Sequence, residues 1–179
     1  MGGGLATGDG GGAFAPNLPE WTLPGLACAS AGLVSVPLYD TSTAHQARHI
    51  LADAGCRMIF VGGDEELAKI AEVRAELPTL ERVVSFEALS APEGASTLAD
   101  ELAAAPADTS AVDVRLEAAT AGDLATIIYT SGTTGDLKGV MLTHRGFVHQ
   151  IELLTDYFRL TPPDVPMCSL RPRERPMGE

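Results

Sequence analysis

The chain has 179 residues, of which 45% are hydrophobic, and these values predict a globular protein that buries about 70% of its unfolded surface. Its net charge of −12 and its isoelectric point near 4.6 argue against nucleic acid as a partner, because nucleic-acid-binding proteins carry a basic surface. Cys28, Cys56 and Cys168 are widely spaced and form no Cys-x-x-Cys pair, so neither a disulfide framework nor a zinc site is indicated.

The N-terminus has no basic segment followed by an apolar run, and no apolar stretch approaches the ~18 residues of a membrane span. We therefore expect a cytoplasmic protein with no transmembrane segment. Residues 1–12 are more than half glycine, a composition with high unfolded-state entropy and little to bury, so this Gly-rich segment is predicted to be disordered. Order is expected to begin near Ala13.

Strand and helix patterns then alternate. Short apolar runs predict strands at 33–39, 57–61 and 82–86, with Pro37 indicating a strand end or an edge strand. Helices are predicted at 24–31, from the capping box Thr43–Gln46 through Ala54, and at 64–77; Thr22, Thr43 and Asp64 are their candidate caps, and Gly32, Gly55 and Pro78 their stops. This alternation predicts an α/β fold with a largely parallel sheet flanked by helices.

The pattern weakens between Ala88 and Gly122, where one helix is predicted at 97–104. Later, Thr143 is a candidate cap for a helix whose apolar residues recur at helical spacing and should face the core; they are Phe147, Ile151, Leu154 and Phe158. His45 and His49 lie four residues apart on the second helix, where they are either surface histidines or two ligands of a metal site that lacks further ligands.

Residues 127–140 read Ile-Ile-Tyr-Thr-Ser-Gly-Thr-Thr-Gly-Asp-Leu-Lys-Gly-Val. The apolar runs at 124–129 and 140–142 predict two strands joined by a tight polar loop. Glycines in this loop let the backbone approach a ligand, the Ser and Thr hydroxyls add donors, and Lys138 adds a positive charge, a combination that suits a polyphosphate. The alternative is an ordinary polar turn. Neither a Walker A loop nor a dinucleotide fingerprint fits this spacing.

The segment from Tyr129 to Val140, continuing to His144, resembles the phosphate-loop signature of the adenylate-forming (AMP-binding) enzymes, which include acyl-CoA synthetases, luciferases and peptide-synthetase adenylation domains. Leu137 stands where that family usually has proline. The segments 17–21 and 36–41 look most similar to long-chain fatty acyl-CoA synthetases. The resemblance implies an α/β fold, here an incomplete N-terminal subdomain of an adenylate-forming enzyme. It also implies that the strand expected at residues 10–12 is damaged or absent, because three glycines replace its side chains.

The resemblance further implies ATP-dependent activation of a long-chain fatty acid to an acyl-adenylate and then to acyl-CoA, with ATP, Mg²⁺ and coenzyme A as cofactors or co-substrates. Position by position, it implies a nucleotide-binding set of Thr130, Ser131, Gly132, Thr133, Thr134, Gly135 and Lys138, with the Thr130 hydroxyl near Mg²⁺. The catalytic residues of the family would lie downstream, so none is assigned here. His144 and Arg145 either lie near the bound phosphates or have capping and surface roles.

These observations divide the chain into a Gly-rich segment at 1–12, a partial AMP-binding domain at 13–170 and an unrelated tail at 171–179. The tail departs abruptly from the family pattern, and we interpret it as a frameshift or an incorrect gene-model end; reading the DNA in the other two frames tests this. The 179-residue chain is expected to be inactive alone. The alternative is a non-catalytic remnant, at most a weak phosphate binder.

Overall fold

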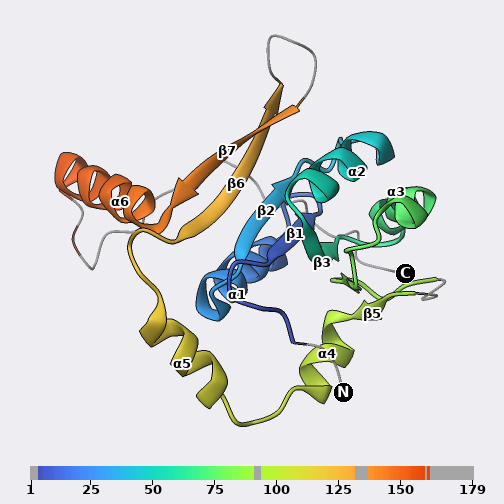
Figure 1. Ribbon diagram of the computed structural model, residues 1–179, viewed down its shortest axis with the longest axis horizontal. Helices are drawn as coiled ribbons and strands as arrows, with labels where there is room; N and C mark the ends of the chain where they lie inside the picture. Colours follow the sequence, from blue (N-terminus) through green and yellow to red (C-terminus); the bar gives the residue numbers. More distant parts are fainter. Residues whose placement is uncertain (1–3, 91–93, 132–136, 160, 162–179) are drawn as a thin grey trace.

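The computed structural model describes residues 4–90, 94–131, 137–159 and 161. Its strands, in chain order, are β1 (Gly10–Phe14), β2 (Val34–Leu38), β3 (Cys56–Val61), β4 (Arg82–Ser85), β5 (Ser96–Thr97), β6 (Leu124–Ser131) and β7 (Leu137–Thr143). Within the described residues these strands form one seven-stranded sheet in the order β5-β4-β3-β1-β2-β6-β7 (Figure 1). Neighbouring strands are parallel except β6 and β7, which form an antiparallel hairpin.

The α-helices are α1 (Thr22–Ala31), α2 (Ala44–Asp53), α3 (Asp64–Val73), α4 (Leu98–Ala104), α5 (Ser110–Ala118) and α6 (His144–Phe158). Short 3-10 turns lie at Pro19–Trp21 and Arg74–Glu76. The predicted α/β class, with a largely parallel sheet flanked by helices, is confirmed. Helix α5 was not predicted, because its sequence has no clear apolar face.

Local sequence explains where α2 begins and where α1 and α2 end. The Thr43 hydroxyl accepts a hydrogen bond from the Gln46 amide at 3.2 Å, and the Gln46 side chain accepts one from the Thr43 amide at 2.9 Å, which is the predicted capping box. Gly32 and Gly55 follow α1 and α2 with φ of 66° and 60°, a left-handed conformation that glycine adopts without a Cβ penalty.

Two predicted caps are wrong in detail. Thr22 lies inside the first turn of α1, where its hydroxyl donates to the Pro19 carbonyl at 2.9 Å, and Trp21 is the N-cap. Asp64 is the first residue of α3 rather than its cap, and its carboxylate accepts a hydrogen bond from the Ser90 amide at 3.0 Å. Both side chains therefore satisfy backbone groups outside their own helices.

The central strand β1 corrects a second expectation, because Gly10–Gly12 were predicted to be disordered and their strand to be lost. They instead form buried strand between β2 and β3, with Gly11 opposite Ser35 and Met58. Side chains from the neighbouring elements fill the space that strand side chains would occupy. A Cβ on Gly11 would lie 2.7 Å from the Cys28 sulfur, and one on Gly12 would lie 3.0 Å from both Ile59 and Leu51. The glycines therefore allow close packing onto the middle of the sheet.

Two clusters of buried side chains pack against the sheet. The larger cluster joins Phe14, Val36 and Ile59 to apolar residues of α2 and α3, among them Leu51 and Ile70. In the smaller cluster, Phe60 and Phe86 stack with ring centroids 5.9 Å apart, and Leu18 packs with them. Sheet order and helices on the faces thus give the layered arrangement that the βαβα pattern predicts.

Pro37 is the next-to-last residue of β2. The first of the two predicted alternatives, a strand end, is therefore confirmed. The edge alternative is wrong, since β2 lies between β1 and β6. Strands β2 and β6 pair at Ser35 and Thr126, near the start of β6. The Thr126 hydroxyl there donates to the Ser35 carbonyl at 2.7 Å. Beyond this point the hairpin projects past the rest of the sheet (Figure 1).

Helix α6 follows the hairpin and stands apart from the sheet (Figure 1). The prediction that its apolar stripe faces the core is wrong: Phe147, Ile151, Leu154 and Phe158 are 44%, 61%, 43% and 62% exposed. Helical spacing predicts that side chains share a face, but it does not specify what covers that face. Here α6 follows β7, which is the last strand at one edge of the sheet, and the described elements do not cover the stripe.

Candidate functional site

The candidate site lies at the end of the β6–β7 hairpin. Strand β6 runs parallel to β2, and it ends at Ser131, whose backbone pairs with Leu137 on β7. The loop between these residues therefore follows the carboxyl end of a parallel strand, which is the edge where open α/β sheets bind ligands. The two predicted strands are confirmed, while the polar loop predicted between them lies outside the described residues.

The structure describes three of the seven predicted nucleotide-binding residues, at least in part. Thr130 and Lys138 lie directly opposite each other in the antiparallel register, so their side chains share one face of the hairpin. Both side chains are exposed. Ser131 is described as the last residue of β6. The remaining four lie outside the described residues; they are Gly132, Thr133, Thr134 and Gly135.

The opposite face of the hairpin contacts α2. Tyr129, which precedes Thr130, is 3% exposed, and its hydroxyl donates to the Asp53 carboxylate at 2.6 Å. Burial and the hydrogen bond to this carboxylate raise the pKa of Tyr129 well above its ordinary value, so the phenol stays protonated. Nε2 of His49 lies 3.1 Å from the Leu137 carbonyl oxygen on β7. Both strands of the hairpin are thus tied to one helix near the loop.

Gly139 lies opposite Tyr129 in the hairpin. A Cβ at this position would lie 2.7 Å from Ile127 and 3.1 Å from the Tyr129 ring, so only glycine leaves room for the ring over β7. The sequence motif includes this glycine, but its steric role became visible only in the structure. His49, Asp53 and Tyr129 were likewise not predicted as site residues; the spacing of His49 and Asp53 on one helix face was the available signal.

A cavity of about 300 Å³ lies between the hairpin and the β2–α2 connection. Its lining is largely polar and comprises Tyr39, Thr41, Ser42, Gln46, Ile50, Tyr129 and Leu137. The cavity is therefore on the α2 side of the hairpin, away from the face that carries Thr130 and Lys138.

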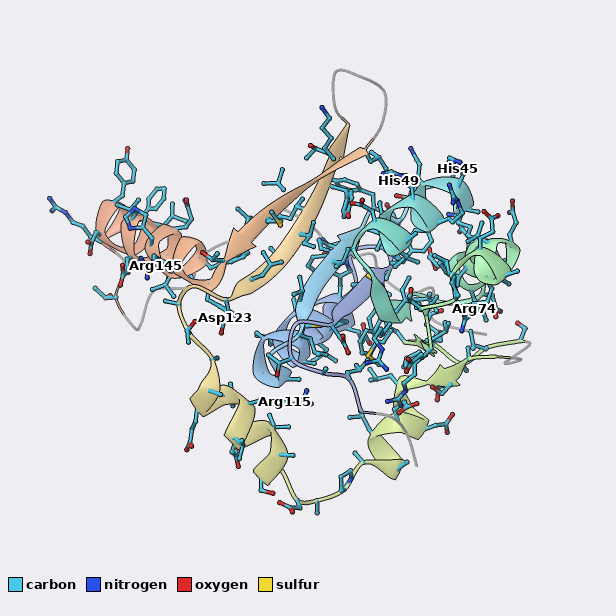
Figure 2. All side chains as sticks on the ribbon, viewed as in Figure 1. His45, His49, Arg74, Arg115, Asp123 and Arg145 are labelled. Carbon is cyan, nitrogen blue, oxygen red and sulfur yellow. The ribbon has the colours of Figure 1, made fainter. Side chains whose placement is uncertain are left out.

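His144 and Arg145 lie at the end of β7 far from the loop, which favours the capping and surface alternative over contact with a phosphate bound at the loop. A strand rises about 3.4 Å per residue, which separates Lys138 from His144 by roughly 20 Å. Their backbone amides donate to the carbonyls of Asp123 and Ala121 at 3.1 and 2.9 Å. Figure 2 shows Arg145 and Asp123 together at this end of the hairpin, away from its tip.

The described residues contain no group of three or more His, Cys, Asp or Glu side chains arranged to hold a metal ion. His45 and His49 both lie on α2 (Figure 2); His45 is exposed, and His49 Nε2 lies 3.1 Å from the Leu137 carbonyl oxygen of the hairpin. The hydroxyl of Thr130 is a hard oxygen ligand on an exposed strand end, and it suits Mg²⁺ only as one ligand among phosphate oxygens and waters. These residues therefore fit a metal that arrives with a nucleotide.

Cys28 and Cys56 are free and buried. Burial raises the pKa of Cys28 to about 11, and burial together with the nearby Cys28 raises the pKa of Cys56 to about 12, so neither thiol is a reactive thiolate at neutral pH. Cys168 lies outside the described residues.

Comparison with protein families agrees with this geometry, since the model of the family described as "AMP-binding enzyme" matches residues 2–172. The chain belongs to the AMP-binding enzyme family. The match includes the hairpin with its glycine- and hydroxyl-rich loop, which confirms the resemblance inferred from the sequence.

Several relatives are fatty-acid or acyl-CoA ligases. The long-chain-fatty-acid–CoA ligase FadD15 of Mycobacterium bovis is 37% identical over 139 residues, which cover 78% of this chain and 23% of the relative. The peroxisomal acyl-CoA ligase 891 of Penicillium brevicompactum is 35% identical over 148 residues, covering 74% of this chain and 21% of the relative. The chain thus spans less than a quarter of the length of either protein.

The crystal structure of ATP-bound MatB from Rhodopseudomonas palustris superimposes with a TM-score of 0.70 at 32% identity, covering 90% of this chain and 30% of MatB. The fold of this AMP-binding chain is therefore that of part of an ATP-binding relative. No helix among the described residues is both long enough and apolar enough to cross a bilayer.

Proposed function

We propose that this AMP-binding chain is part of an ATP-dependent ligase that activates a long-chain fatty acid to an acyl-adenylate and then forms acyl-CoA. The observation that carries the proposal is the β6–β7 hairpin. The loop sequence characteristic of the family follows β6 directly, at the carboxyl end of a strand that runs parallel to β2. Similarity to long-chain-fatty-acid–CoA ligase FadD15 supports the choice of fatty acid and coenzyme A. A cytoplasmic location is part of the proposal, although one relative is named peroxisomal.

In this proposal the nucleotide-binding residues are Thr130, Ser131, Gly132, Thr133, Thr134, Gly135 and Lys138. Their amide, hydroxyl and ammonium donors hold the β- and γ-phosphates of ATP while the fatty-acid carboxylate attacks the α-phosphate. Pyrophosphate leaves in this step, and negative charge builds up on it. Donors that are already in place stabilise that charge without reorganisation.

Lys138 is the cation of this set. It lies on the same face as Thr130 and next to the Ser131–Leu137 pair, which is the last described pair of the hairpin before the loop. A lysine acts there as a point charge toward phosphate oxygens. When bound, Mg²⁺ would share the charge of the phosphates, and Thr130 is the residue that would offer it a hydroxyl.

Substituting Lys138 tests the phosphate-binding role. Titrating the purified chain with MgATP in a calorimeter should show that Lys138→Ala weakens affinity by about tenfold or more, since a charge-assisted contact is lost. Lys138→Arg keeps the positive charge, so it should lose less MgATP affinity than Lys138→Ala. Arg159→Ala removes one exposed positive charge from the end of α6 and serves as the matched control. Equal affinity of Lys138→Ala and the unaltered chain would refute the assignment.

We expect the chain alone to lack ligase activity, since it spans only 23% of the ligase FadD15. Incubation with ATP, Mg²⁺, coenzyme A and palmitate should therefore release no pyrophosphate. The alternative is a non-catalytic remnant that binds phosphate weakly or not at all. MgATP binding that depends on Lys138 favours the ligase origin of the site, while absence of binding favours the remnant.

A further inference from the structure

We infer that His49 and Asp53 of α2 are positioning residues that hold both strands of the β6–β7 hairpin and thereby set the two ends of the phosphate loop. The inference rests on the proposed function for its consequence, which is affinity for the phosphates of ATP. The contacts of His49 and Asp53 with the hairpin are part of the described structure and do not depend on that function.

The hairpin needs support because the sheet does not hold its far end. Strand β6 pairs with β2 at Thr126 and Ser35, and the hairpin then extends beyond the sheet toward Ser131 (Figure 1). A two-stranded hairpin without a packed face is only marginally stable in water. Another element must therefore fix the direction in which the residues after Thr126 point.

Helix α2 supplies that support with two side chains on one face. His49 and Asp53 are four residues apart, the spacing at which helical side chains are neighbours. Asp53 accepts the Tyr129 hydroxyl hydrogen bond from β6 at 2.6 Å, and His49 Nε2 lies 3.1 Å from the Leu137 carbonyl of β7. A carbonyl oxygen can only accept, so His49 carries its proton on Nε2. One helix thus holds both strands.

Ring packing makes the two contacts interdependent. The His49 and Tyr129 rings meet edge to face, with centroids 6.4 Å apart and planes at 86°. Tyr129 in turn lies against Gly139, where a Cβ would approach its ring to 3.1 Å. Moving the Tyr129 ring would therefore disturb the histidine that holds β7 as well as its own contact with Asp53.

The position of these contacts relates them to phosphate binding. Tyr129 is adjacent to Thr130, and Leu137 is adjacent to Lys138, so each anchored residue neighbours a residue of the proposed nucleotide-binding set. The anchored side chains face α2, whereas Thr130 and Lys138 face the other side of the hairpin. The α2 residues therefore act on the phosphate contacts only through the backbone and do not contact the nucleotide themselves.

Tyr129→Phe and Asp53→Ala test this inference in the full 179-residue chain. Each should increase hydrogen–deuterium exchange of the β6 and β7 amides without ATP, and each should weaken MgATP binding by about fivefold to tenfold, the effect of losing one charge-assisted hydrogen bond. Asp53→Asn keeps an acceptor for the Tyr129 hydroxyl, so its hydrogen–deuterium exchange and its MgATP affinity should stay close to those of the unaltered chain. Tyr157→Phe, at an exposed tyrosine of α6, is the matched control and should change neither.

The two measurements separate the inference from the function on which it rests. Unchanged exchange in the hairpin of Tyr129→Phe and Asp53→Ala would overturn the positioning role. Faster exchange with unchanged MgATP affinity would also overturn it, because the contacts would then be merely structural. If the unaltered chain fails to bind MgATP while exchange responds as expected, the proposed function of the loop is overturned and the contacts of α2 with the hairpin stand.

Discussion

The glycine-rich central strand makes a prediction that can be worked out from distances. A Cβ added to Gly11 would lie 2.7 Å from the sulfur of Cys28, roughly 1 Å closer than the ~3.5–4.0 Å of an ordinary contact. Overpacking of a buried site costs about 1–3 kcal/mol, and replacing a strand glycine by alanine offsets about 0.5–1 kcal/mol of that. Gly11→Ala should therefore lower the free energy of unfolding by roughly 0.5–2 kcal/mol.

The physical cause of this loss can be isolated by removing the sulfur. Cys28→Ala alone should cost about 1 kcal/mol, since it deletes one buried heavy atom. In the double variant the Cβ added at Gly11 occupies space that the sulfur has left, so the two changes should cost about 1–2 kcal/mol less together than their sum. Gly25→Ala in α1 is the matched control: apart from the adjacent residues and the helix's own backbone, no atom lies within 4 Å of the added Cβ, and the substitution should raise the free energy of unfolding by about 0.5–1 kcal/mol.

Urea unfolding followed by the fluorescence of Trp21, the one tryptophan in the chain, measures all four variants. Two results would refute the packing explanation. One is additivity of Gly11→Ala and Cys28→Ala within about 0.5 kcal/mol. The other is a stabilisation by Gly11→Ala equal to that of Gly25→Ala, which would mean that the sulfur does not restrict the strand.

Two further predictions concern α2 and α3. Thr43→Ala should lower the free energy of unfolding by about 0.5–2 kcal/mol, and Thr43→Ser should restore most of it, because serine keeps the cap for the Gln46 amide; urea unfolding measures both. Burial raises the pKa of Glu66, so its contribution to stability is present below the unfolded-state pKa and is lost as pH rises through the folded-state pKa. Glu66→Gln should therefore raise the melting temperature at pH 7 and have little effect near pH 4, and an equal effect at both values would contradict this cause.

Much of the architecture was predictable because it depends on local patterns. The capping box at Thr43, the left-handed glycines after α1 and α2 and the short apolar strands each act over a few residues, and alternation of such elements favours a parallel sheet. The family was also predictable, because the residues from Tyr129 to Val140 carry its loop signature in the sequence itself. The hairpin form of this segment follows from the apolar runs on either side.

Expectations failed where the outcome depended on residues distant in sequence. Gly10–Gly12 have little to bury as an isolated segment, yet they form the middle of the sheet because Cys28, Leu51 and Ile59 fill the space beside them. The apolar stripe of α6 has the expected spacing, but the helix follows the last strand at one edge of the sheet and the described elements leave the stripe exposed. For His144 and Arg145 the sequence left two alternatives open: they are close to the loop in sequence, whereas a full strand separates them from it in space.

The sequence alone therefore determined the type of most local elements, with β1 and α5 as exceptions, and the residue types of the segment between Thr130 and Lys138. Tertiary structure decided which strand is central, which apolar face is covered and which side chains of α2 contact the hairpin. The physical reason is that propensity and spacing act along the chain, while steric fit and hydrogen bonding act between residues that only the fold brings together. The contact of Tyr129 with Asp53, across 76 positions of the chain, is one such pairing.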